Sequence, residues 1–107
     1  AAPSMELTDW KSIYHLYELL YQFQPNPVIA LNKAIASAYA ISKQNAMDEL
    51  KQVKGLENHH LYYASLGEIC FELQRWSEAR TYFEQALQRT SSHSEQQLLR
   101  EKIALCN

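Results

Sequence analysis

The stretch from Tyr63 to Leu87, YASLGEICFELQRWSEARTYFEQAL, decides the fold of this 107-residue chain. It is predicted to form a helix, a tight turn at residues 74–76 and a second helix. Gly67 lies on the first of these helices and Ala79 on the second. Because both residues are small, two antiparallel helices can approach closely at these positions. The stretch therefore predicts a packed helical hairpin.

This hairpin resembles a tetratricopeptide repeat, whose W-x2-L-G-x2-Y…A-x3-F pattern recurs about every 34 residues. The positions that match in type are Leu66, Gly67, Ala79, Phe83 and Ala86, while Tyr63 and Cys70 replace the Trp and Tyr. Ser91 stands where the pattern expects proline, so that stop signal is missing. Ala34 and Ala46 precede Gly67 and Ala79 by the same 33 positions, which indicates a degenerate earlier copy of the hairpin.

The rest of the chain must supply neighbours, because a single hairpin of this kind cannot bury both of its faces. Hydrophobic residues make up 47% of the chain and charged residues 21%, with only two glycines and three prolines. This composition favours helices over a sandwich or a barrel. We expect a single domain over residues 8–107, a common size for one domain. Residues 1–7 are expected to be a disordered linker or a cloning remnant.

Cap and stop residues place the remaining helices. Thr8 is the expected cap of a first helix that ends before Pro25, and Asn26 caps a second helix that begins with Pro27. Asn45 is expected to cap a third helix after a turn at residues 42–45. The predicted helices span residues 10–24, 27–41, 46–54, 58–73 and 77–89, and a last one follows a Ser-x-x-Glu capping box at residues 92–95. The expected fold is all-α, a right-handed tetratricopeptide-like array of about six antiparallel helices.

Charge and motifs exclude several classes of function. The net charge of −2 provides no basic surface for nucleic acid. No stretch approaches the roughly 18 consecutive apolar residues of a membrane span. We therefore expect a cytoplasmic protein without membrane or direct nucleic-acid contacts. No motif joins a nucleophile to a base, and no glycine-rich phosphate loop occurs, so we predict no catalytic residues, no cofactor and no enzyme activity.

The cysteines and histidines give no sign of a metal site. Cys70 and Cys106 are 36 residues apart, without C-x-x-C spacing, and are predicted to be buried free thiols. His59 and His60 are adjacent in the sequence, so their rings are expected to point apart on a helix instead of sharing a metal ion. We therefore predict no metal ligands.

A second resemblance covers nearly the whole chain past residue 8. The run PNPVIALNKAIASA at residues 25–38, with the later LQRWSEARTYFEQAL and SHSEQQLL, is similar to the C-terminal tetratricopeptide-like domain of some bacterial extracytoplasmic-function RNA polymerase sigma factors. The P-x-P-V-x-A-L-N-[KR]-A pattern is its most specific part. The chain departs from the family at residues 42–45, where a Gly/Pro-rich turn is usual, and at residues 96–97, where arginine is common.

That resemblance implies a non-catalytic regulatory domain, which modulates transcription initiation through contacts with upstream sigma-factor domains or RNA polymerase. The alternatives are a free-standing tetratricopeptide scaffold that binds an unidentified protein and a helical oligomerisation domain. The candidate protein-binding residues are Asn32, Tyr39, Glu68, Phe71 and Glu72, on the helices expected to line the inner groove. They predict a partner with an apolar face and a basic rim. The competing interpretation is that these residues are core, and that Asn32 holds two helices in register through a hydrogen bond.

Overall fold

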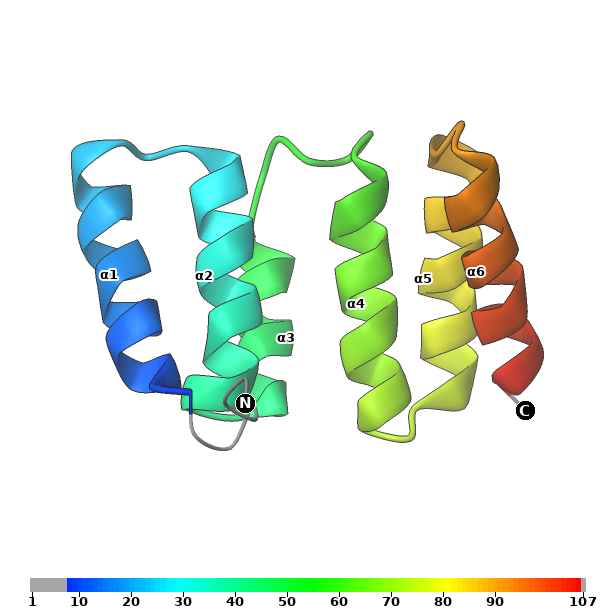
Figure 1. Ribbon diagram of the computed structural model, residues 1–107, viewed down its shortest axis with the longest axis horizontal. Helices are drawn as coiled ribbons and strands as arrows, with labels where there is room; N and C mark the ends of the chain where they lie inside the picture. The colour runs from blue at the N-terminus through cyan, green and yellow to red at the C-terminus, as the bar shows by residue number, and fades with distance from the viewer. Residues whose placement is uncertain (1–7, 107) are drawn as a thin grey trace, which may run out of the picture.

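The computed structural model describes residues 8–106, which contain six α-helices and no strand. The helices are α1 (Trp10–Phe23), α2 (Pro27–Ala40), α3 (Lys43–Gln52), α4 (His60–Glu72), α5 (Trp76–Arg89) and α6 (His93–Leu105). Consecutive helices run antiparallel (Figure 1). The hairpins α2–α3 and α4–α5 are preceded by α1 and followed by α6, so the predicted helical array is confirmed. The prediction about residues 1–7 lies outside the described residues.

Two predicted helix caps are wrong. The cap of α1 is Asp9 instead of Thr8, since its carboxylate accepts hydrogen bonds from the Ser12 backbone at 3.1 Å and the Ser12 hydroxyl at 2.6 Å. The cap of α3 is Ser42 instead of Asn45, since the Ser42 hydroxyl accepts from the Asn45 backbone at 3.0 Å. The polar run at residues 42–45 therefore opens a helix and does not form a turn, in keeping with the helix propensity of lysine and glutamine.

Smaller shifts occur around the second hairpin. Helix α4 begins at His60, two residues after the predicted start, because Nδ1 of the preceding His59 accepts from the backbone of Leu61. Helix α5 begins at Trp76, one residue earlier than predicted. The turn between them contains Gln74 at a φ of 61°, a left-handed conformation that turns the chain sharply.

The core lies between the two hairpins and under α6. Its buried members are Leu31, Ala34, Ala46, Met47, Leu50, Leu56, Leu66, Ile69, Cys70, Ala79, Phe83, Ala86, Leu99 and Cys106. A Cβ atom built on Gly67 would lie 2.7 Å from two ring carbons of Phe83, whose side chain is 0% exposed. Glycine therefore allows the close approach of α4 and α5 that the sequence predicts.

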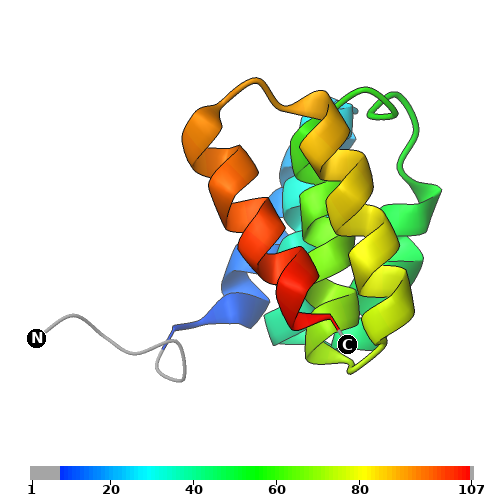
Figure 2. The ribbon, with the colours of Figure 1, turned by 90° about the vertical axis from the view of Figure 1, so that its right-hand side faces the viewer.

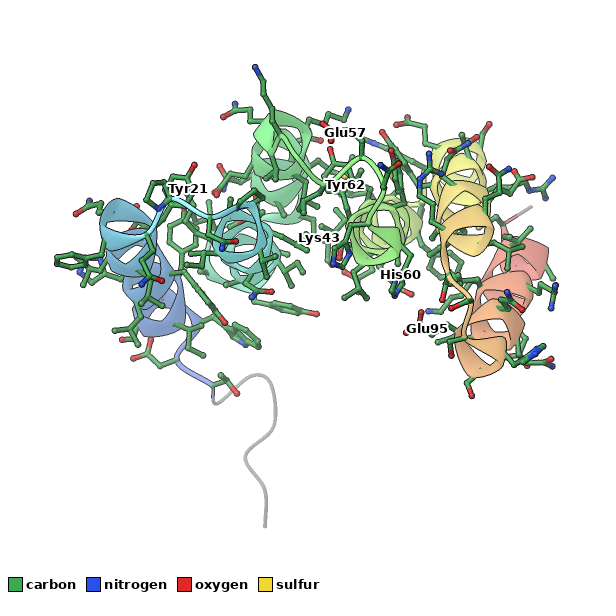
Figure 3. The ribbon with its side chains drawn as sticks, turned by 90° about the horizontal axis from the view of Figure 1, so that it is seen from above. Tyr21, Lys43, Glu57, His60, Tyr62 and Glu95 are labelled. Carbon is green, nitrogen blue, oxygen red and sulfur yellow. The ribbon has the colours of Figure 1, made fainter. Side chains whose placement is uncertain are left out.

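The helices at the two ends are less deeply packed. Helix α1 has no fully buried residue and rests on α2, leaving Leu16, Leu20 and Phe23 exposed on its other face. Helix α6 packs on α5 and crosses the end of the array obliquely (Figure 2). From above, α3 and α5 lie on one side of the molecule and α6 on the other (Figure 3). The central helices α2 and α4 thus keep one face free of α3 and α5.

Candidate protein-binding groove

A groove of about 250 Å³ lies between α2 and α4. It is lined by Ile35, Ala38 and Tyr39 from α2 and by Ala64, Ser65, Glu68, Ile69 and Glu72 from α4. Ala64 and Glu68 follow His60 at intervals of four residues, and His60 points away from α3 and α5 in Figure 3. The groove therefore opens on the side of the array that the outer helices leave free.

Tyr39 is the largest exposed apolar surface in the groove. Its side chain is 45% exposed, and its ring stacks on Trp10 of α1 with the centroids 4.5 Å apart. Burial raises the pKa of Tyr39, and the negative charges of Glu72 and Glu68 raise it further. The phenol is therefore neutral at physiological pH and lies within the field of both carboxylates, where it can donate a hydrogen bond.

The two groove carboxylates already have partners within the chain. Glu68 Oε1 lies 2.7 Å from Nζ of Lys102 on α6, and Glu72 Oε2 lies 3.7 Å from Nζ of Lys43 at the start of α3. Both glutamates remain well exposed, so each pair contributes little to stability, about 0–1 kcal/mol. The two pairs instead hold the acidic side chains in place at the groove, with neither lysine among the lining residues.

The structure brings together three of the five candidate residues, Tyr39, Glu68 and Glu72. Phe71 lies elsewhere: it is half-buried against α5, with its ring 5.0 Å from that of Trp76 and 6.5 Å from that of Phe83. Phe71 therefore packs on the core.

Asn32 is also outside the groove. It is half-buried on α2, and the described part of the chain offers its amide no hydrogen-bond partner. The expected helix-to-helix hydrogen bond from Asn32 is therefore not formed.

The polar link between the first three helices is made by Glu49, which sequence reasoning missed. Glu49 Oε2 accepts from the Tyr14 hydroxyl at 2.8 Å and from the Asn45 amide at 2.6 Å, while Lys33 Nζ lies 3.0 Å from Oε1. These contacts come from α1, α3 and α2. The i, i+4 spacing of Asn45 and Glu49 was the one local signal; the other partners are distant in sequence.

A further contact joins α4 to α6 above the groove. His60 Nε2 lies 2.8 Å from Glu95 Oε2, and both side chains face the side away from α5 (Figure 3). The expectation that the rings of His59 and His60 point apart is wrong, since they stack with centroids 5.6 Å apart. His59 caps the helix with an extended backbone, which turns its ring alongside that of His60.

Both thiols lie in the interior of the described chain. Cys70 and Cys106 are buried and free, as predicted, and Cys106 is the C-terminal cap of α6. Burial raises the pKa of both thiols, which keeps them protonated and unreactive. Within residues 8–106, no three His, Cys, Asp or Glu side chains gather as metal ligands would. Over the same residues, no helix has the length and apolar character needed to cross a membrane.

Comparisons with known proteins agree with the architecture. Residues 60–93 match the tetratricopeptide repeat family, and this span covers the α4–α5 hairpin and reaches the start of α6. The chain is 32% identical over 99 residues to an uncharacterized protein of Rhizobium meliloti (strain 1021). Those residues are 92% of this chain but only 23% of the relative, so the chain spans about a quarter of its length. No solved structure matches the chain. Tetratricopeptide arrays present concave surfaces on which other proteins bind.

Proposed function

We propose that the chain is a non-catalytic, cytoplasmic protein-interaction module that binds a short segment of a partner protein in the α2–α4 groove. The observation that carries this proposal is the exposed Tyr39 beside two fixed carboxylates on the face that the outer helices leave free. An aromatic residue that is nearly half exposed is unusual in a core position and typical of a binding surface.

The groove favours a particular kind of segment. Its floor of Ile35, Ala38 and Ile69 is apolar, and its volume of about 250 Å³ suits one large side chain as an anchor. Glu68 and Glu72 line one wall without a lining lysine or arginine, so a cationic residue beside the anchor is favoured. The proposed ligand is therefore an apolar anchor residue flanked by lysine or arginine.

We further propose that the partner is the upstream part of a sigma factor to which this chain is the C-terminal extension. The motif at residues 25–34, with its resemblance to such extensions, supports this proposal. The relative in Rhizobium meliloti is about four times as long as the matched region, which is consistent with a module inside a longer protein. A free-standing tetratricopeptide scaffold is the second candidate, favoured by the repeat match alone.

The test begins with the full reading frame that encodes the chain. If helix-turn-helix regions precede residue 8, their product is expressed separately and its affinity for the chain is measured by isothermal titration calorimetry. Simple charge reversal at Glu68 would place two cations side by side, because Lys102 is 2.7 Å away. The informative variants are therefore exchanges: Glu68→Lys with Lys102→Glu, and Glu72→Lys with Lys43→Glu. Each exchange retains an ion pair while it reverses the charge at the groove.

We expect both exchanges combined to weaken binding at least tenfold, and Tyr39→Ala to weaken it about as much. The matched control is Asp48→Lys with Glu84→Lys, which reverses two exposed charges on the outer helices α3 and α5. Binding that survives the exchanges but not the control would place the partner on the outer face and end the groove proposal. A reading frame without sigma-factor regions would leave the scaffold as the function.

A further inference from the structure

A second pocket lies on a different part of the molecule, where the α1–α2 connection meets the end of α3. Its volume is about 330 Å³. It is lined by Tyr21, Pro25, Pro27, Ala30, Lys33, Glu49, Gln52, Val53 and Lys54. Tyr21 lies in this region, beside the junction of α1 and α2, in Figure 3. Four of the lining residues belong to the motif at residues 25–34, and the proposed groove uses none of them.

The apolar part of the pocket wall is formed mainly by Tyr21 and two prolines, which lie beside the cap of α2. Pro25 and Pro27 flank Asn26, whose side chain caps α2 by accepting from the Val28 backbone at 2.7 Å. Gly55 packs against the Pro27 ring, since a Cβ atom built on Gly55 would lie 3.4 Å from Cγ of Pro27. A pocket between proline rings and a tyrosine suits a flat apolar body.

The charges in the pocket sum to a positive value. Two lysines and one glutamate line the pocket, which leaves one net positive charge. The dipole of α3 places roughly half a negative charge at the C-terminal end of that helix, which is too little to cancel it. Glu49 accepts hydrogen bonds from Tyr14 and Asn45 and forms an ion pair with Lys33, so the unbalanced positive charge in the pocket is that of Lys54. Lys54 has no ion-pair partner among residues 8–106. Lys33 carries three donor hydrogens and its amine also lies 5.4 Å from the Tyr14 ring centroid, so donors remain for a ligand.

We propose that this pocket binds a small organic anion, with its carboxylate at Lys54 and Lys33 and its apolar body between Tyr21 and the two prolines. A volume of about 330 Å³ is within the range of pockets that bind small organic molecules. An aromatic carboxylate meets both requirements. The proposal is independent of the α2–α4 groove, because the two sites share no lining residue.

The experiment is a titration of the ¹⁵N-labelled chain followed by amide chemical shifts. The probes are 4-hydroxybenzoate, its neutral counterpart 4-hydroxybenzamide, and inorganic phosphate, which carries charge without an apolar body. We expect saturable shifts at the lining residues with 4-hydroxybenzoate and at least tenfold weaker affinity for the other two. Phosphate that binds as well would overturn the apolar part of the proposal, and 4-hydroxybenzamide that binds as well would overturn the anionic part.

Two lysine variants test the placement of the carboxylate. Lys54→Met lies at an exposed position, so the fold is retained and the affinity for 4-hydroxybenzoate should fall at least fivefold. Lys51→Met is the control, since Lys51 is an exposed lysine in the last turn of α3, three residues before Lys54, and does not line the pocket. Equal affinity in both variants, or shifts confined to residues outside the pocket, would refute the proposed site.

Discussion

Replacing Gly67 by alanine tests how closely α4 and α5 approach. The added methyl carbon would lie 2.7 Å from Cδ1 and Cε1 of Phe83 and 3.1 Å from its Cγ. Helix propensity favours alanine over glycine by about 1 kcal/mol. The Phe83 ring is fully buried, however, so it can move only by displacing core neighbours, and overpacking of this kind costs about 1–3 kcal/mol. We expect a net loss of about 1 kcal/mol, equivalent to a melting temperature lower by about 4–8 °C.

The assay is thermal and urea denaturation followed by circular dichroism, in a cycle with Phe83→Leu. Leucine is smaller than phenylalanine, so it makes room for the new methyl group. The double variant should therefore be more stable than the sum of the two single changes predicts, by at least about 0.5 kcal/mol. A Gly67→Ala chain as stable as the parent, or strictly additive losses, would show that Gly67 does not contact the Phe83 ring.

Three further changes probe the polar contacts. Ser42→Ala should lower the free energy of unfolding by about 1 kcal/mol, since the backbone N–H of Asn45 loses its hydrogen-bond acceptor. An unchanged free energy of unfolding would instead favour a helix that begins after Asn45. Glu49→Ala should lower the free energy of unfolding by about 1–3 kcal/mol, because the Tyr14 hydroxyl and the Asn45 side-chain amide lose their acceptor. The control Asp48→Ala, at an exposed position, should leave the free energy of unfolding nearly unchanged in the same denaturation experiments. Burial raises the pKa of Cys70 and of Tyr14 in the folded chain. Each group therefore stabilises the fold fully below its unfolded pKa, about 8.5 for cysteine and 10 for tyrosine. This stabilisation is lost as the pH rises through the folded pKa. Melting temperatures should fall between about pH 8 and 11, less steeply in Tyr14→Phe, and a flat profile would contradict this.

The architecture could be predicted because small residues at fixed intervals carry most of the information. Gly67 and Ala79 mark the contact of one hairpin, and Ala34 and Ala46 repeat it 33 residues earlier; in the structure all four are buried. The caps were harder to assign. Ser42 and Asn45 are both good N-cap residues three positions apart, and only the helical geometry of Lys43 and Gln44 decides between them.

The candidate site could be predicted only in part. Helical spacing placed Tyr39, Glu68 and Glu72 on one surface. It also included Phe71, whose side chain packs against α5 instead. Helical spacing holds no information on which neighbouring helix a half-buried side chain meets.

The ion pairs with Lys43 and Lys102 could not be foreseen either. These lysines lie 29 and 34 residues from their partners Glu72 and Glu68 and are brought close only by the packing of α3 and α6 on α4. The pocket at the α1–α2 connection likewise depends on how three helices meet.

The central claim is that the partner binds in the groove between α2 and α4. Its most direct test is chemical-shift mapping of the ¹⁵N-labelled chain on addition of the separately expressed sigma-factor region that is proposed as its partner. The account predicts that the largest shifts cluster at Ile35, Tyr39, Ala64 and Glu68, and that the exposed Leu16 and Phe23 of α1 change little. Shifts centred on the outer face of α1, with the groove unaffected, would contradict it.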